Sequence, residues 1–229
     1  ELFFSGYVST LLKREYQEIY TVFSGGDDLF LIGPWDTLAD LAVRLEQAFR
    51  RFTGQNPCLT LSGALTMAAP GTHIAALAED CEERLKQVKD QPPGRVYPDK
   101  QGRDGVYFMG QIFTWEDLRR QLSIGRQLLQ TALANNMSAL QRILRFSQMY
   151  QSFLETGDVF QLMYDPMFFY DRQLHYKQLL QGDPWLRGYI DQLAENVADL
   201  KQINRTLYFA QTAARYAMSG VKEARKYGL

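Results

Sequence analysis

Hydrophobic positions in the first half of the chain alternate between helical and strand-like spacing. Apolar residues recur at helical spacing in residues 2–17, whereas residues 19–24 and 29–33 are short β-branched and aromatic runs. These two runs flank a glycine-containing loop at residues 25–28, which predicts a β-hairpin. We expect Asp36 to cap the next helix, whose leucines and phenylalanines share one face.

The same alternation continues as far as residue 113. Apolar and polar residues alternate in residues 59–67, which predicts a strand with one buried face. Residues 74–88 carry the apolar stripe of a helix, and a proline-containing loop then precedes a strand predicted at residues 105–110. With one strand placed upstream of residue 1, the order becomes the βαββαβ pattern of a ferredoxin-like α+β domain.

Residue 114 begins a different pattern, made of long helical segments. Thr114 is followed three residues later by Asp117, which is typical of a capping box at a helix start. The predicted helices span residues 115–135, 139–156, 166–181 and 184–219. The chain is therefore predicted to contain an α+β domain at residues 1–113 and an all-α bundle at residues 114–229.

The composition excludes several classes of protein. Of the 229 residues, 46% are hydrophobic, which is enough for a packed core and excludes a disordered chain. No apolar run reaches the roughly 18–20 residues of a membrane-spanning helix, so no membrane partner is expected. Cys58 and Cys81 are too few for a disulfide framework; they favour a cytoplasmic location, and we expect both to pack beneath the sheet. His73 and His175 lie too far apart in sequence for the usual zinc spacings.

The segment Ser24-Gly25-Gly26-Asp27-Asp28 carries the clearest chemistry. Two adjacent carboxylates on a rigid hairpin repel each other unless a cation neutralises them, and such oxygens suit Mg²⁺ or Mn²⁺ together with substrate phosphates. The two glycines have no Cβ, so a nucleotide can approach the backbone closely. The motif predicts a metal-dependent nucleotidyl-transfer site, although Gly and Asp are also the residues that an ordinary turn prefers.

This hairpin and its neighbours resemble a known family. The run IYTVFSGGDDLFLIGPWD (19–36) resembles the second palm domain of the large subunit of type III CRISPR effector complexes, most like the Csm-type (subtype A) branch. Four further segments resemble the same domain, in order along the chain: LFFSGY (2–7), LSGAL (61–65), AEDCEERLKQVK (78–89) and GRDGVYFMG (102–110).

The resemblance implies a cyclase-like polymerase palm that converts ATP into cyclic oligoadenylates when the complex binds target RNA. It assigns Asp27 and Asp28 to the divalent ions, Mg²⁺ or Mn²⁺, of a two-metal reaction, and Gly25 and Gly26 to the backbone wall beside the nucleotide. Further candidate nucleotide contacts are Ser24, Ser62, Lys86 and Lys89. Each of these four has a structural alternative: a hydroxyl that is only solvated or locally bonded, or a lysine that complements a helix dipole.

The resemblance also implies parts of a larger protein. A further metal-binding carboxylate, a nuclease domain of the HD type, a first palm domain and a zinc-binding insertion would precede Glu1, so the 229 residues alone are expected to turn over ATP poorly. In diguanylate cyclases the loop ends in Glu-Phe, whereas here it ends in Asp28-Leu29. This difference argues against that class. The alternatives are a non-catalytic palm and scaffold in the same complex and, third, a nucleotide cyclase of another signalling system.

Residues 114–229 resemble, more weakly, the C-terminal helical domain of the same subunits, which implies other protein subunits and the guide and target RNA as partners. Candidate phosphate contacts, with a solvated helix surface as the alternative, are Arg119, Arg120, Arg126, Arg142, Arg145, Arg205, Arg215, Lys222, Arg225 and Lys226. A set of aromatic residues is predicted to form core or a subunit interface rather than a base-stacking platform: Tyr164, Phe168, Phe169, Tyr170, Tyr176 and Trp185.

Overall fold

The computed structural model divides the chain into two compact units, Glu1–Arg119 and Arg120–Leu229. It describes residues 2–69, 71–92, 94–100, 102–133, 137–176, 183–195 and 203–226. The two units divide within helix α4 (Trp115–Leu133), whereas the sequence pattern changes at its first turn. Each unit is described below by itself.

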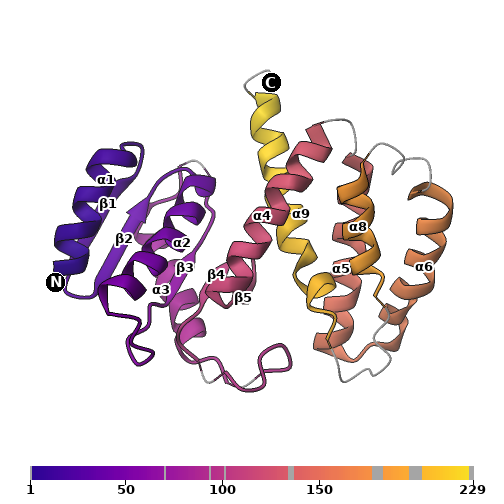
Figure 1. Cartoon of the computed structure of the whole chain (residues 1–229), viewed down its shortest axis with the longest axis horizontal. Coiled ribbons are helices and arrows are strands. Elements are labelled where there is room, and N and C mark those ends of the chain that lie inside the picture. The colour runs from indigo at the N-terminus through magenta and orange to yellow at the C-terminus, as the bar shows by residue number, and fades with distance from the viewer. Residues whose placement is uncertain are drawn as a thin grey trace. The chain divides into compact units, whose positions relative to one another are not determined.

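The first unit begins with a helix of two different pitches. A π-helix, η1 (Leu2–Val8), continues into α1 (Ser9–Glu15), and the chain turns at Tyr16 (Figure 1). Phe3 is buried and packs edge-on against Phe49 of the next helix, with ring centroids 5.2 Å apart. The helix predicted at residues 2–17 is therefore confirmed, except at its C-terminal end.

The predicted hairpin is present and its strands are longer than expected on the loop side. β1 (Tyr20–Gly25) pairs antiparallel with β2 (Asp28–Ile32), so the strands extend into the predicted loop at residues 25–28. The register shifts between Thr21 and Phe23, which leaves Val22 as a bulged residue without a partner in the ladder.

Helix α2 (Trp35–Phe52) follows two residues after β2 and therefore runs back along the hairpin. The prediction of Asp36 as its N-cap was wrong, because Pro34 occupies that position. Proline has no N–H to leave unpaired and is tolerated at a helix start. Asp36 lies in the first turn instead, where its Oδ1 accepts a hydrogen bond of 2.8 Å from the backbone N–H of Thr37.

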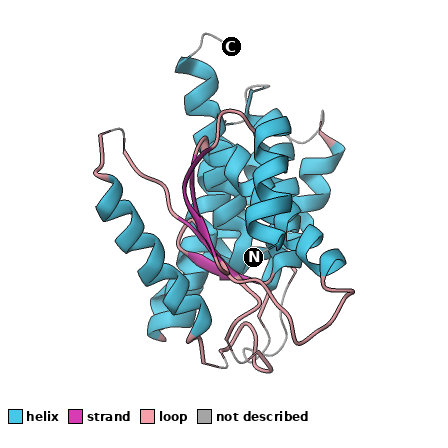
Figure 2. Ribbon diagram, turned by 90° about the vertical axis from the view of Figure 1, so that its left-hand side faces the viewer, coloured by secondary structure: helices cyan, strands magenta, loops and turns pink. Residues whose placement is uncertain are grey.

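The remaining strands form a separate, three-stranded sheet. β3 (Gly63–Leu65) pairs parallel with β4 (Val106–Phe108), and β4 pairs antiparallel with β5 (Gln111–Phe113). Helix α3 (Ile74–Lys89) connects the two parallel strands (Figure 1). Figure 2 shows the strands in magenta and the helices in cyan. Among the described residues no strand joins this sheet to the β1–β2 hairpin, so the ferredoxin-like order is present in two pieces.

Two strand predictions need correction. The strand predicted at residues 59–67 is shorter because a turn precedes it: the Asn56 side chain accepts a hydrogen bond from the Cys58 N–H, and its carbonyl accepts one from the Leu59 N–H. The strand predicted at residues 105–110 ends early and β5 was missed. The reason is a turn at Met109 and Gly110, which have φ of 49° and 92°, and a non-glycine residue rarely adopts such a φ.

The second unit is entirely helical in the part that the structure describes. After α4 come α5 (Met137–Thr156), the short segments η2 (Val159–Met163), α6 (Tyr164–Asp171) and η3 (Arg172–Tyr176), then α8 (Pro184–Leu193) and α9 (Arg205–Lys226). The buried core is formed mainly where α5 packs against α9, around Ile143, Leu140 and Ala213. The α+β region followed by an all-α region agrees with the predicted fold class.

The long helix predicted at residues 184–219 was wrong, since α8 and α9 are separate. Asn204 lies between them and is buried. Its Oδ1 accepts a hydrogen bond of 2.9 Å from the N–H of Leu207, while its Nδ2 donates to the carbonyls of Leu193 and Glu195. One side chain thus caps the start of α9 and satisfies carbonyl groups at the end of α8.

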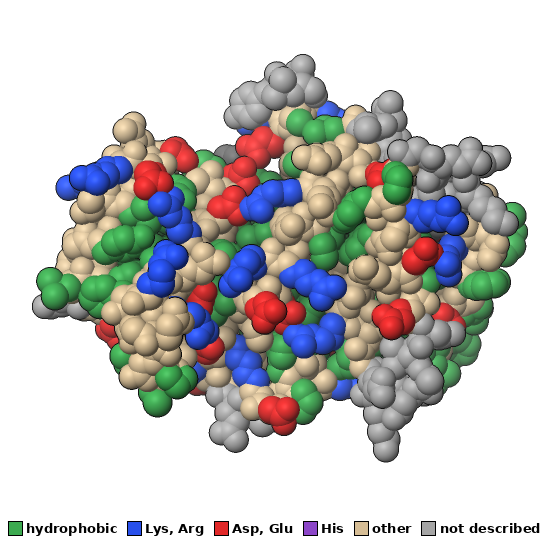
Figure 3. Space-filling model, in the orientation of Figure 1, with side chains coloured by type: hydrophobic (Ala, Val, Ile, Leu, Met, Phe, Trp, Pro, Cys, Tyr) green, Lys and Arg blue, Asp and Glu red, His purple; other side chains and the backbone are tan. Residues whose placement is uncertain are grey.

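Charges of both signs are interspersed on the face shown in Figure 3, as the near-neutral composition leads one to expect.

Thr114 and Asp117 form the predicted capping box: the Thr114 hydroxyl accepts from the Asp117 N–H at 3.2 Å and donates to the Asp117 carboxylate at 2.8 Å. Within the described ranges, no helix combines the length and the apolar composition needed to cross a bilayer.

Candidate functional site

The GGDD segment lies at the tip of the β1–β2 hairpin. Gly25 pairs with Asp28, which leaves Gly26 and Asp27 as a two-residue turn. Gly26 has φ of +62°, the conformation that a type II′ turn requires at its first central position. Both carboxylates are on exposed residues, and a Cβ placed on Gly26 would meet no atom within 4 Å. The two acids therefore come directly after open backbone at Gly26 that a ligand can approach closely.

The residues just before the turn complete one wall of the candidate site. A Cβ on Gly25 would lie 3.1 Å from Cζ of Phe23, whose side chain is 55% exposed, so an aromatic ring lies against this glycine. Ser24 is half-buried, and its Oγ is shielded from solvent without a hydrogen-bond partner among the described residues. A shielded hydroxyl without a partner costs about 1–3 kcal/mol, so a ligand group that bonds to it would recover that cost.

The topology brings further predicted residues to the same end of the domain as the turn. Because α2 runs back from the end of β2, its C-terminus and the start of β3 lie at the end that carries the turn. Helix α3 links two parallel strands, so its last turn, with Lys86 and Lys89, also returns to that end. Ser62 is half-buried and immediately precedes β3, whereas both lysines are exposed. These residues share one end of the palm, and their joint contact with a ligand stays a prediction.

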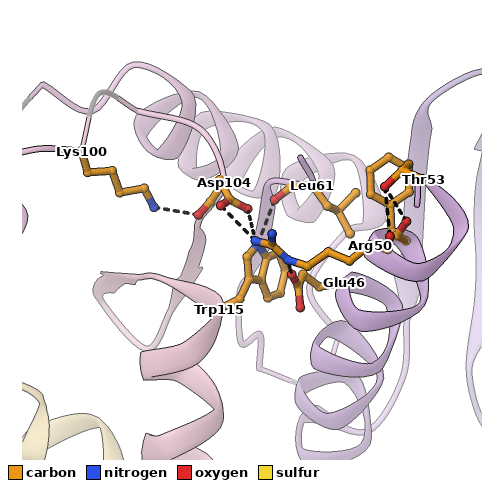
Figure 4. Close-up of polar contacts among 8 residues, drawn as sticks. Glu46, Arg50, Thr53, Leu61, Lys100, Asp104 and Trp115 are labelled. Carbon is orange, nitrogen blue, oxygen red and sulfur yellow. Dashed lines mark hydrogen bonds and ion pairs between the residues drawn. The ribbon is translucent and has the colours of Figure 1, made fainter. Parts of the chain in front are cut away.

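A network of charges at this end was missed from the sequence (Figure 4). Arg50, in the last turn of α2, pairs with the buried carboxylate of Glu46 and with both carboxylate oxygens of Asp104, each at 3.1 Å. Lys100 donates a hydrogen bond of 2.8 Å to the backbone carbonyl of Asp104. The Glu46 carboxylate raises the pKa of Arg50, and burial lowers the pKa of Lys100. The spacing of Glu46 and Arg50 signals a helical ion pair, but no local pattern points to Asp104.

The donor set suits a hard divalent cation in one specific way. Asp27 and Asp28 supply carboxylate oxygens, and Mg²⁺ in proteins is commonly held by one or two carboxylates plus substrate phosphates and water. The described residues contain no group of three or more His, Cys, Asp and Glu side chains arranged to hold a metal ion. The two acids therefore fit a cation whose remaining ligands come from a nucleotide, or from residues not described.

The prediction that both cysteines pack beneath the sheet is partly wrong. Cys58 is exposed in the turn before β3 and does not pack beneath a sheet. Cys81 is half-buried on α3, and its Sγ lies 3.0 Å from Oγ1 of Thr66. His73 is exposed and precedes α3, while the side chain of His175 lies outside the described residues.

The basic residues of the helical unit lie mainly on exposed helix surface. Arg142 is an exception, because it pairs with Asp171 of α6. Arg215 is half-buried, and Arg126, Arg205 and Arg215 all take part in interactions. The role of these residues as phosphate contacts stays a prediction.

The predicted aromatic set divides into core and surface. Phe168 is buried against Phe146 at a centroid distance of 5.0 Å, and Trp185 stacks on Tyr189 at 5.5 Å. Tyr164 packs against Tyr150, Phe169 and Tyr170 are exposed, and the side chain of Tyr176 lies outside the described residues. Core packing thus accounts for half of the set.

Comparison with known proteins matches residues 1–96 to the family described as Cas10/Cmr2, second palm domain. Three similar relatives are each named a CRISPR system single-strand-specific deoxyribonuclease, Cas10/Csm1 (subtype III-A). The protein of Thermococcus onnurineus is 27% identical over 173 residues, 66% of this chain and 22% of its own length. That of Methanocaldococcus jannaschii is 34% identical over 100 residues (39% and 12%), and that of Enterococcus italicus 30% over 136 residues (59% and 16%).

The chain spans less than a quarter of the length of these relatives. The matched region contains η1, the hairpin with its GGDD turn, α2, β3 and α3. The resemblance inferred from the sequence is therefore confirmed: residues 1–96 match the second palm domain of the Cas10/Cmr2 family, and the similar relatives support a part of a type III CRISPR large subunit.

Proposed function

We propose that this palm is a metal-dependent nucleotidyltransferase that joins ATP into cyclic oligoadenylates when the assembled effector complex binds target RNA. The observation that carries the proposal is the GGDD turn, where Asp27 and Asp28 directly follow the open backbone of Gly26 at the tip of a hairpin. The match of residues 1–96 to the Cas10/Cmr2 second palm domain supports it. In each bond-forming step, a 3′ hydroxyl of one ATP attacks the α-phosphate of another, the P–O bond to the leaving pyrophosphate breaks, and the hydroxyl proton is released.

Each residue has a distinct part in this proposal. Asp27 and Asp28 hold Mg²⁺ or Mn²⁺, which when bound supplies neutralisation of charge on the phosphate oxygens. The Gly25–Gly26 backbone lets the nucleotide approach, and the unpartnered Ser24 Oγ can bond to it. Lys86 and Lys89, exposed at the end of α3, offer positive charge to the triphosphate. Ser62, before β3, is a further polar contact.

The partners of the helical unit follow from the same proposal. We propose that the helical unit contacts other protein subunits and lies near the guide and target RNA within a cytoplasmic complex. Exposed apolar residues on η2 and α6 favour a protein contact: Val159, Phe160, Met163, Phe169 and Tyr170 are each more than half exposed.

The decisive experiment replaces the two acids in the full effector complex. Asp27→Ala/Asp28→Ala should abolish oligoadenylate formation from ATP after target RNA is added, while RNA binding stays nearly unchanged. Asp99→Ala, an exposed acid in the loop before β4, is the matched control and should retain product formation. Persistence of product in the double variant would refute the assignment.

A non-catalytic palm is the second candidate. One observation favours it: the described residues lack a cluster of three potential metal ligands. A structural palm would leave ATP binding by the full complex independent of divalent cations, whereas the proposed enzyme requires that dependence. A calorimetric titration of ATP with and without Mg²⁺ separates the two.

A further inference from the structure

Three successive residues before β4 adopt left-handed backbone conformations. Gly102, Arg103 and Asp104 have φ of 56°, 51° and 45°. Asparagine and aspartate visit this region with some ease, but arginine does so at a cost. Such strain persists only where the surrounding contacts hold it, and it concentrates near functional sites. We name residues 102–104 the strained turn.

The strained turn closes against the C-terminal end of α3. The N–H of Arg103 donates a hydrogen bond of 3.2 Å to the carbonyl of Val88, one of the last carbonyls of that helix. Gly102 lies so close to Lys89 that an added Cβ would be 2.3 Å from the Lys89 carbonyl oxygen. Only glycine fits there, both for this contact and for its positive φ.

The other side of the strained turn is held by α2 and by the preceding loop. The Arg50 guanidinium binds both carboxylate oxygens of Asp104, and Lys100 donates to the Asp104 carbonyl (Figure 4). Glu46 in turn pairs with Arg50 from within α2. A continuous set of contacts therefore runs from the last turn of α2, through Asp104, to the last turn of α3.

We propose that the strained turn positions Lys89 for the triphosphate of the nucleotide at the GGDD turn, and that Arg50 and Asp104 act as positioning residues through it. This inference rests on the proposed function. The lysine side chain is exposed and flexible, so its reach is defined by how firmly its backbone is held. The strained turn holds that backbone through the hydrogen bond from Arg103 to the carbonyl of Val88, the residue before Lys89, and Arg50 links the strained turn to the last turn of α2.

The test compares Gly102→Ala with Gly94→Ala in the full effector complex. An added Cβ at Gly94 would meet only a carbonyl oxygen at 3.9 Å, so this variant is the matched control. We expect Gly102→Ala to raise the KM for ATP about tenfold, the loss of roughly one charged contact, with kcat changed less than about twofold. Hydrogen exchange of the amides at the end of α3 should become faster in the same variant.

A second variant guards against misfolding. Asp104→Asn keeps a residue that tolerates positive φ but removes the charge that Arg50 binds. It should raise the KM in the same direction by a smaller factor, while Asp99→Asn leaves it unchanged. Arg50→Gln should also raise the KM. Arg50→Lys should raise it less, because lysine restores the charge but not the two-pronged contact.

The outcomes separate this inference from the proposed function. A KM in Gly102→Ala and Asp104→Asn equal to that of their controls, with normal wild-type turnover, would overturn the positioning role alone. Faster exchange with an unchanged KM would show that the strained turn only stabilises α3. A wild-type complex that makes no product from ATP would overturn the proposed function, and with it the role of Lys89.

Discussion

Replacing Arg50 by Met leaves the carboxylate of Glu46 buried without its cation. The Glu46 side chain is 3% exposed, whereas Arg50 and Asp104 are 39% and 38% exposed. Removing one partner of a buried pair costs about 3–5 kcal/mol, and an exposed pair contributes only about 0.2–1 kcal/mol. Because Arg50 is itself partly solvated, we take the lower end of the buried-pair range and expect the free energy of unfolding to fall by about 3 kcal/mol. Nearly all of this loss comes from the buried Glu46 carboxylate that is left without a partner cation.

Urea unfolding followed by tryptophan fluorescence measures this change in the first unit. The chain has three tryptophans, and Trp185→Phe leaves Trp35 and Trp115, both within residues 1–119. Arg51→Met is the matched control, because Arg51 is the exposed neighbour on the same helix; it should change stability by less than about 0.5 kcal/mol.

A double variant tests whether the fall in the free energy of unfolding comes from the unpaired Glu46 carboxylate. Glu46→Met/Arg50→Met removes the whole pair and should recover most of the loss, since apolar replacements of buried pairs are often neutral. The reasoning is refuted if Arg50→Met is no less stable than Arg51→Met, or if the double variant is as unstable as the two single changes added together.

Three further predictions concern packing, pH and the candidate site. Gly125→Ala should destabilise the helical unit by about 1–3 kcal/mol in urea unfolding, because its Cβ would lie 2.8 Å from a tyrosine ring of α9; Gly188→Ala, with open space around it, should stabilise by about 0.5–1 kcal/mol, and equal effects would contradict the packing. Burial raises the pKa of Tyr164 to about 12 and also that of Tyr189; the folded state then holds protons that the unfolded state releases, so stability should fall as pH rises from about 10 towards 12. Tyr164→Phe should reduce that fall by about 1–2 kcal/mol after allowance for screening, and an unchanged pH dependence would count against it. Ser24→Ala should raise the free energy of unfolding by about 1–3 kcal/mol, because it removes a shielded hydroxyl that has no partner among the described residues; in the full complex it should weaken ATP binding, and unchanged affinity would remove Ser24 from the site.

Local pattern was enough to locate the parts of the palm that have strong periodicity. The apolar stripes of α2 and α3 and the two runs around the GGDD turn are signals contained in short stretches of chain. The turn itself was recognisable because glycine and aspartate have specific conformational and chemical uses there.

The parts that could not be predicted depend on distant residues or on unusual backbone. β5 follows Met109, whose φ of 49° no local rule anticipates, and Asn204 separates α8 from α9 through carbonyls of another helix. The contact of Arg50 with Asp104 joins positions 54 residues apart. Such contacts form only when the elements pack, so the strained turn and its link to α3 emerge from the structure alone.

The central claim is that the GGDD turn binds a nucleotide together with a divalent cation. Calorimetric titration of ATP into the full effector complex with bound target RNA, with Mg²⁺ and with a chelator, measures this directly. We predict binding that requires Mg²⁺ and is lost in Asp27→Asn/Asp28→Asn, which keeps the shape of both side chains but removes their charge. Equal affinity with and without Mg²⁺, or unchanged affinity in the double variant, would contradict the claim.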